Sequence, residues 1–423
     1  MTDERGVLRR IAWRELFPWL IIFRSFRLAI SPTLLLVATL AVFMTGIGWQ
    51  AGTYVFLTED QRIAAAPGPP LDAHVPRAVA KYLPAEESSA SGGFFRLAEP
   101  FYSLFRRELT IRHAAYYAFA SLWSLAIWAF AGGIITRRAV LEFGVEETPD
   151  FMETVKFVAR RYLWYFLAPL YPLCGILLLL LPVAALGFVA WLHDFGFLLA
   201  GVLWIFVVLA GVVAAWLLAG LLFGWPLMWG TISTEREGDA FEAFSRSFSY
   251  VYGKPLHYLF YAVVAALFGA LCWAVAHYAA NIIIEFGFWT FSWGAGAERT
   301  EQIEDLAILS QTQWLGEGDG SLLARCGGTL LGLAIRLVRL IESGFTLSFF
   351  WCVAGAIYLL LRQDVDDKEL DDVYVPAEMP APRGPVSAAA TPTPERAPAP
   401  IPATDAPPEP NQRPVETVQV PPP

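Results

Sequence analysis

The sequence predicts an all-α, polytopic membrane protein of about six transmembrane helices, arranged as three helical hairpins and followed by a disordered C-terminal tail. Hydrophobic residues make up 56% of the 423 residues and charged residues only 16%. The apolar residues gather in long windows without charge, which is the pattern of transmembrane helices. An amphipathic segment precedes the first, third and fifth windows, and this spacing groups the windows into hairpins.

Six charge-free windows are long enough to cross a membrane, for which about 20 residues suffice. We expect the first span at 29–49, because the run without charge around it is too long for a cleaved secretory signal. The other windows follow in order: 114–136, 162–192, 195–234, 255–284 and 343–361. The fourth window is much longer than one span needs, so it also contains a bend, which we expect at Pro226.

Two long external loops are predicted, near 59–113 and 285–342. The second ends in an apolar stretch, 321–342, which is either an interfacial helix or the outer part of the last span. The sequence leaves both alternatives open. Three charged side chains recur in this stretch at helical spacing, and they either pair with one another or extend toward the interface: Arg336, Arg339 and Glu342.

Short amphipathic helices are predicted on the cytoplasmic membrane surface before each hairpin, at 9–26, 148–161 and 239–252. The third is the best marked, since Asp239 stands where an N-cap belongs and Glu242 follows three residues later. Its hydrophobic positions share one face at helical spacing: Phe241, Phe244, Phe248 and Val251. In the second, Thr148 is the expected N-cap. Gly220 and Gly224 in the fourth window form a GxxxG pattern compatible with close helix packing.

Composition divides the chain into three parts: a basic N-terminal segment, 1–27, the six-span domain, 28–361, and a Pro-rich acidic segment, 362–423. The last part holds more than half of the 30 prolines and buries too little apolar surface to offset its chain entropy, so we expect it to be disordered. The short connections on the side of the N-terminus carry most of the Arg and Lys. The positive-inside rule therefore predicts cytoplasmic N- and C-termini in the cell inner membrane.

Two stretches resemble a family of uncharacterised bacterial multi-pass membrane proteins. The family's motif around a Pro-containing span is similar to residues 231–262, TISTEREGDAFEAFSRSFSYVYGKPLHYLFYA. Its last span and acidic exit are similar to residues 348–374, SFFWCVAGAIYLLLRQDVDDKELDDVY. With the order of elements, the resemblance covers roughly residues 10–375. More distantly, the plan is similar to the integral-membrane domain found beside glycerophosphodiester phosphodiesterase domains, whose catalytic barrel is absent here. The resemblance implies a topology and no activity.

Basic side chains at the predicted cytoplasmic boundary are candidates for binding lipid headgroups: Arg137, Arg138, Arg160, Arg161 and Lys254. Each such cation near an anionic surface contributes about 1 kcal/mol to membrane binding. The alternative is that these residues only fix the topology, and one arrangement can do both.

A polar stripe runs along the fifth window, because His277, Asn281 and Glu285 are spaced four residues apart. Polar groups inside a membrane are costly, so a stripe of this kind suggests contact with an ion, a proton or a substrate. The favoured interpretation is structural: the stripe approaches the interface and meets water there.

Several function classes are not supported by any motif. The sequence has no GxSxG, HExxH or Walker A pattern, and its four cysteines form no CxxC pair, so we expect neither an enzyme nor a metal or cofactor site. A charge-poor bundle with an acidic tail also argues against nucleic-acid binding. The acidic run 364–372 is expected to be a solvated linker and not a cation site.

Two functions stand ahead of a third, a lipid-modifying enzyme, which comes last because the sequence shows no nucleophile–base constellation. The favoured one is a non-enzymatic membrane-organising or partner-binding module that contacts membrane lipids and, through its C-terminal tail, other proteins. The alternative is a small transporter or channel, suggested by the prolines that interrupt the third and fourth windows. Against transport, none of the six windows contains Asp, Glu, Lys or Arg. Neither the oligomeric state nor the partner follows from the sequence.

Overall fold

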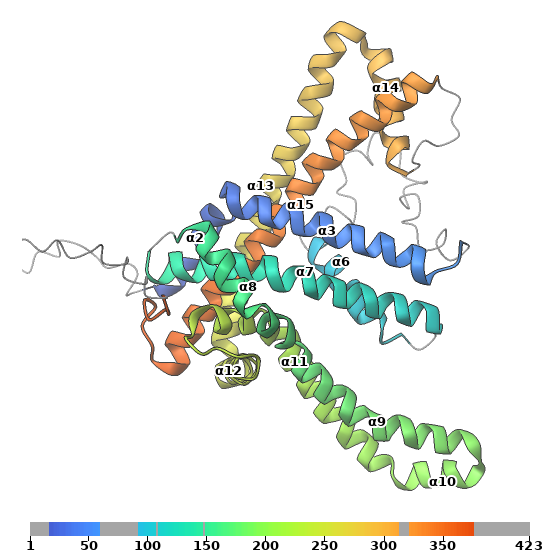
Figure 1. The fold of residues 1–423 in the computed structure, drawn as a ribbon, viewed down its shortest axis with the longest axis vertical. Coiled ribbons are helices and arrows are strands. Elements are labelled where there is room, and N and C mark those ends of the chain that lie inside the picture. Colours follow the sequence, from blue (N-terminus) through green and yellow to red (C-terminus); the bar gives the residue numbers. More distant parts are fainter. Residues whose placement is uncertain (1–16, 60–91, 107–108, 147–148, 313–320, 376–423) are drawn as a thin grey trace, which may run out of the picture. The chain divides into compact units, whose positions relative to one another are not determined.

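The computed structural model describes residues 17–59, 92–106, 109–146, 149–312 and 321–375. The chain divides into two compact units, Met1–Tyr374 and Val375–Pro423, and every contact below lies in the first. The described residues form helices and no strand (Figure 1). Residues 1–16 and 376–423, which include most of the predicted tail, lie outside the described part.

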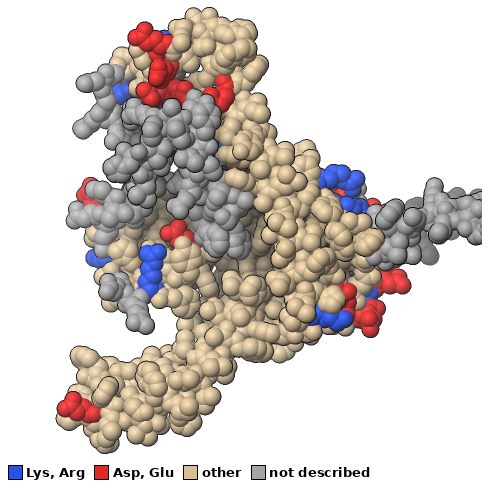
Figure 2. Space-filling view, turned by 180° about the vertical axis from the view of Figure 1, so that it is seen from behind, with Lys and Arg blue, Asp and Glu red and all other residues tan. Residues whose placement is uncertain are grey.

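Six helical segments are long and apolar enough to span a membrane, which confirms the predicted polytopic fold. They are α3 (Pro32–Phe56), α7 (Ile111–Gly144), the run Phe151–Leu192 formed by α8 (Phe151–Leu167) and α9 (Leu170–Leu192), α11 (Trp204–Thr234), α13 (Pro255–Ala295) and α15 (Leu322–Asp366). On the face shown in Figure 2, acidic and basic side chains gather in a few patches separated by broad uncharged surface. A chain of this kind is a multi-pass membrane protein.

The spans pair as the three predicted hairpins (Figure 1). The first joins α3 and α7. The second joins α9 and α11 through a short helix, α10 (Asp194–Val202), and the third joins α13 and α15 through α14 (Ala297–Thr312). The bend expected at Pro226 lies elsewhere: α10 and α11 are separated at Leu203, whereas Pro226 is buried within α11. A proline in a membrane helix is tolerated when neighbouring helices surround it.

Several helices continue well past their apolar windows. The 41 residues of α13 and the 45 residues of α15 correspond to lengths of about 60 Å and more, roughly twice the hydrocarbon thickness of a bilayer. The region near 285–342, expected to be an external loop, is therefore largely helical. Residues 322–342 belong to the same helix as the last span, as the second of the two alternatives proposed. In the other expected loop, α6 (Gly92–Ser103) is described.

The last span is the centre of the packing. Helix α15 contacts α3, α7, α11, α13 and α2 (Ile21–Ala29), which follows the 3-10 turn Pro18–Leu20. Most of its apolar window is buried, while the windows of the α8–α9 run and of α11 are mostly exposed. The hydroxyl of Ser348 donates to Ala29 O at 3.1 Å and so ties α15 to α2. The apolar windows of the second hairpin are thus largely surface, and the apolar window of α15 is the protein's interior.

Tryptophans fill the junction of α7, α11 and α15. The rings of Trp229 and Trp351 stack with centroids 4.1 Å apart, and Trp128 also stacks with Trp351, with centroids 6.4 Å apart. The indole N–H of Trp229 donates to Tyr165 O at 2.9 Å. Gly132 of α7 faces this stack, where an added Cβ would come within 2.9 Å of atoms of both Trp229 and Trp351. Only a residue without a side chain fits there.

Helix α12 (Ala240–Gly253) confirms the predicted capped helix. The Glu242 amide donates to Asp239 Oδ1 at 2.7 Å, which satisfies one of the free N–H groups of the first turn. Its hydrophobic face is divided, however: Phe248 and Val251 are buried, whereas Phe241 is 62% exposed. The buried side packs on α11, where Gly220 makes room for the Phe248 ring and Gly224 for Ser247. The GxxxG pattern therefore accommodates α12.

The second amphipathic segment differs from its predicted form. Helix α8 starts at Phe151 after the N-cap residue Asp150, and no side-chain hydrogen bond caps it. Thr148, the expected N-cap, lies outside the described residues. Only Ala168 and Pro169 separate α8 from α9, so the amphipathic segment passes almost directly into the third span.

Candidate functional site

Four polar side chains meet between α13 and α15, and we name them the polar ring: His277, Asn281, Arg339 and Glu342. His277 and Asn281 lie one turn apart on α13, and Arg339 and Glu342 lie one turn apart on α15. Residues three or four positions apart share a helix face, so each helix presents one pair to the other. The polar ring contains two of the three predicted stripe residues, while Glu285 is exposed one turn farther along α13.

The hydrogen bonds of the polar ring form a closed cycle. His277 Nδ1 lies 2.8 Å from Glu342 Oε1, and Arg339 Nη1 donates to Glu342 Oε2 at 2.9 Å. Arg339 Nη2 donates to Asn281 Oδ1, and Asn281 Nδ2 lies 3.1 Å from His277 Nε2. The indole of Trp273 stacks on the imidazole with centroids 4.9 Å apart.

The cycle determines where the histidine proton lies. A guanidinium only donates, so the acceptor end of the Asn281 amide must face Arg339. Its NH₂ end then faces His277 Nε2, which must accept. The remaining proton of the neutral imidazole is therefore on Nδ1 and is donated to Glu342.

The polar ring is buried and electrically balanced. Glu342 and His277 are each 8% exposed, while the Arg339 side chain is 37% exposed and connects the polar ring to its surroundings. The Glu342 carboxylate is paired with the Arg339 guanidinium, as a buried charge requires. Glu342 lies 20 residues before Arg362 along α15, a distance of about 30 Å, which equals the hydrocarbon thickness. The polar ring and Arg362 are therefore separated by about one hydrocarbon thickness along α15.

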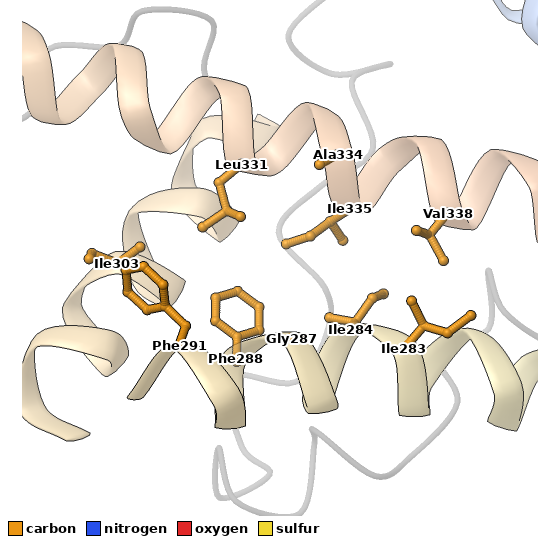
Figure 3. Close-up of a pocket in the computed structure, with 10 residues that line it drawn as sticks. All are labelled: Ile283, Ile284, Gly287, Phe288, Phe291, Ile303, Leu331, Ala334, Ile335 and Val338. Atoms are coloured by element: carbon orange, nitrogen blue, oxygen red, sulfur yellow. The ribbon is translucent and has the colours of Figure 1, made fainter. Parts of the chain in front are cut away.

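Apolar cavities flank the polar ring along the seam between α13 and α15. Toward α14, a cavity of about 300 Å³ lies between the side chains of the two helices (Figure 3). Toward α11, a groove of about 490 Å³ begins one turn away, at Trp273 and Phe345. Figure 3 shows Ile283 and Ile284 of α13 facing Ile335 and Val338 of α15. Both linings are almost entirely hydrophobic, so neither suits a hydrated ion.

A second polar group, which we name the anchoring cluster, lies at the other end of the helices: Arg137, Arg161, Glu235, Arg246, Arg362, Lys368 and Asp372. Glu235, just after α11, is its centre. Its Oε1 lies 3.0 Å from Arg246 Nη1, 3.1 Å from Arg362 Nε and 3.3 Å from Lys368 Nζ. Arg362 is 2% exposed and needs these partners to remain charged in the interior.

The anchoring cluster holds the segment after α15. Arg362 donates from Nη1 to Asp372 O at 2.6 Å, and its Nη2 pairs with Asp372 Oδ2 at 3.1 Å. The Tyr374 amide donates to Thr234 O at 2.9 Å. Residues 362–374, which the sequence assigns to a disordered tail and a solvated acidic linker, are thus packed against the helices.

Two of the five lipid-headgroup candidates face inward. Arg137 is 2% exposed; it donates to Ser233 O and Tyr374 O and lies over the Phe157 ring. Arg161 donates to Ile232 O and Glu235 O. Because the last carbonyls of a helix lack internal partners, both arginines stabilise the end of α11. This differs from the predicted headgroup contact and follows from burial that local sequence does not reveal.

The other three candidates remain open to the surroundings. Arg160 and Lys254 are exposed, and Arg138 is partly buried. Each lies at the end of the helices where the anchoring cluster is found, since Arg138 neighbours Arg137, Arg160 neighbours Arg161, and Lys254 follows α12.

Burial also shifts the acid–base behaviour of α12. The Tyr250 hydroxyl donates to Asp366 Oδ2 at 2.5 Å. Burial raises the pKa of Tyr250, and Tyr358 and Asp366 raise it further. Burial lowers the pKa of Arg246, but Glu235, Tyr250 and Glu242 outweigh this and leave it raised. These groups therefore keep the neutral phenol and the charged guanidinium that their contacts require.

Among the described residues, no three His, Cys, Asp or Glu side chains gather as metal ligands would. Comparison with family models, with curated proteins and with solved structures gives no match. The resemblances drawn from the sequence accordingly stay predictions. The fold defines a multi-pass helical membrane protein whose last span forms its core. The polar ring and the anchoring cluster are the two groups of residues from which a function can be proposed.

Proposed function

We propose that this chain is a non-enzymatic, multi-pass protein of the cell inner membrane that acts as a membrane-organising or partner-binding module. Both termini are cytoplasmic in this proposal, because the basic short connections lie on that side. The anchoring cluster then lies at the cytoplasmic surface and the polar ring near the opposite one.

The anchoring of residues 362–374 carries the proposal. Glu235, Arg362 and Asp372 hold the chain just before the Pro-rich segment begins. A module that presents a tail to a partner needs a defined exit point for that tail, and the anchoring of residues 362–374 supplies one. Pro-rich, polar sequences bind partners in extended form at low entropic cost.

Exposed cations beside the anchoring cluster support a contact with lipid. Arg160 and Lys254 are exposed and Arg138 is partly buried, and these three remain available once Arg137 and Arg161 are used internally. Near an anionic bilayer surface, each contributes about 1 kcal/mol. The same residues act as topology determinants, so the two roles coexist.

Crosslinking in intact cells tests the proposal. The full chain and a chain ending at Val375 are expressed at equal levels, crosslinked in the membrane and compared by mass spectrometry. We expect specific partners with the full chain and their loss on truncation. A third chain, in which the order of residues 376–423 is scrambled, controls for composition. Equal partner sets from the full and truncated chains would rule out the role of the tail.

Transport is the second candidate, and one observation favours it. The polar ring separates two cavities along a single helix seam, as a closed gate would. Because both linings are apolar, the substrate would be an apolar or amphipathic molecule and not an ion. Uptake of fluorescent lipid analogues by proteoliposomes, with His277→Ala compared with His257→Ala at an exposed position, tests this candidate. Uptake lost only in H277A would favour transport over the module.

A further inference from the structure

The polar ring has hydrogen-bonding capacity for a neutral histidine only. Of its four members, Arg339 is donor-only and Glu342 acceptor-only, whereas Asn281 has one donor end and one acceptor end. The cycle closes only when His277 donates from Nδ1 and accepts at Nε2. The imidazole is thus held in one tautomer with an accepting lone pair directed at Asn281.

We propose that the polar ring is a proton-binding site in which His277 Nε2 takes up one proton and thereby breaks the cycle. A hydronium ion gives its proton to the Nε2 lone pair, one N–H bond forms, water is released and the net charge of the ring rises by one. The new N–H then faces the NH₂ of Asn281, so two donors oppose each other.

Rotation of the Asn281 amide does not repair the cycle. Turning its oxygen toward His277 places its NH₂ against Arg339, which also only donates. In that orientation the lost bond is the one between α13 and α15. Proton uptake therefore exchanges one link across the seam for another. The Arg339–Asn281 bond is lost, while the bond from His277 Nδ1 to Glu342 becomes charge-assisted, at the point that separates the two apolar cavities.

Among the groups that surround it, His277 is the one that we expect to take up the proton. The charged groups facing it are Glu342 and Arg339 of α15, and Tyr278 of its own helix lies edge-on with centroids 5.8 Å apart. In the described part of the chain, no charged side chain of α2, α12 or α14 contacts it. The Arg339 side chain is 37% exposed, so the polar ring is open to its surroundings on that side. Histidine is also the side chain that changes charge near neutral pH.

Imidazole ¹⁵N spectra of the full chain in lipid nanodiscs test the proposal. The chain has 5 His, so selective labelling gives few signals. A His277→Gln variant identifies the signal, and His257, exposed beside Lys254, is an internal reference. At neutral pH we expect the Nδ1–H tautomer for His277, and on acidification we expect an imidazolium signal from the same residue.

Asn281→Asp is the matched variant. A carboxylate accepts from both Arg339 and a protonated Nε2, so every link of the cycle is satisfied by the imidazolium. We expect a larger imidazolium fraction in N281D than in the native chain at the same pH, with His257 unchanged. An Nε2–H tautomer in the native chain, or equal imidazolium fractions in the two proteins, would overturn the proposal. The tautomer can be read from the native chain without any variant. The result does not depend on whether the chain is a partner-binding module or a transporter.

Discussion

The imidazole Nδ1 of His277 lies 2.8 Å from Oε1 of Glu342 and joins the fifth and sixth spans across 65 positions of sequence. The carboxylate is shared, since Arg339 donates to its other oxygen at 2.9 Å. Both residues are buried. Arg339–Asn281 and Tyr261–Asp364 are further polar links between α13 and α15.

Removing the carboxylate charge should weaken the third hairpin. In Glu342→Gln, Arg339 loses its counter-charge. The new amide has one oxygen and one NH₂ group, so its NH₂ faces a donor, either His277 or Arg339, and we expect this to cost about 1–3 kcal/mol of stability. Thermal unfolding in detergent checks this, with Glu301→Gln on the exposed face of α14 as the control. Equal melting temperatures for E342Q and E301Q would contradict a structural role for the pair.

A methyl group at Gly132 should disrupt the tryptophan stack. Gly132→Ala places a Cβ within 2.9 Å of atoms of Trp229 and Trp351, and overpacking of this kind costs about 1–3 kcal/mol. Gly211→Ala is the matched control, because no atom lies within 4 Å of its Cβ position. There the better helix propensity of Ala should stabilise the protein by up to about 1 kcal/mol. Melting temperatures that move in opposite directions are the expected result, and a tolerated G132A would contradict the packing described.

The N-cap of α12 should contribute measurably to its stability. Asp239→Ala removes the acceptor of the Glu242 amide and costs about 0.5–2 kcal/mol, whereas Asp239→Ser retains an acceptor. Hydrogen exchange of residues 240–244 reports the local effect. Faster exchange in D239A with near-native exchange in D239S is expected, and equal rates in all three proteins would show that the cap is dispensable.

Neutralising Glu235 should release the segment after α15. Three cations share its Oε1, so Glu235→Gln leaves Arg362 with a weaker partner in the interior. Hydrogen exchange and limited proteolysis at 363–374 should increase, while Glu237→Gln, two residues away and exposed, should leave them unchanged. Protection of 363–374 in E235Q equal to that of the native chain would refute the anchoring role.

Alkaline pH should destabilise the region around α12. The pKa of Tyr250 is raised in the folded state by burial, Tyr358 and Asp366, so the folded chain holds the phenol proton more tightly than the unfolded chain. This stabilisation is complete below the ordinary tyrosine value of about 10 and is lost as the pH rises above it. Tyr250→Phe should reduce the fall in unfolding free energy between about pH 9 and 11, with Tyr102→Phe at an exposed position as the control. An identical pH slope in Y250F would contradict the assignment.

Much of the fold follows from local sequence. An apolar window predicts a span because crossing the membrane requires about 20 apolar residues in succession. Asp239 and Glu242 predict the start of a helix because a capping box involves residues three positions apart. The extension of α13 to Ala295 and the beginning of α15 at Leu322 are not visible in this way. The charged residues in these parts of α13 and α15 end the apolar windows, but the helices continue through them.

The sequence predicts which residues of the candidate site share a helix face, but it does not predict that the two faces meet. The spacing of His277 and Asn281 marks one face of α13, and that of Arg339 and Glu342 marks one face of α15, but no local signal pairs the two faces. Arg137 and Arg161 show the same limit, since a boundary arginine directed at headgroups and one directed at carbonyls have the same neighbours in sequence. Glu285 shares the spacing of the stripe and still lies outside the polar ring.

The position of α15 at the end of the chain has a consequence for biogenesis. This helix forms the interior against which α2, α3, α7, α11 and α13 pack, yet the ribosome produces it after all of them. The first five spans must therefore enter the bilayer before their common partner is made, although α3 can already pair with α7 and α9 with α11. The packing that joins these hairpins through α15 forms only after the last span is made.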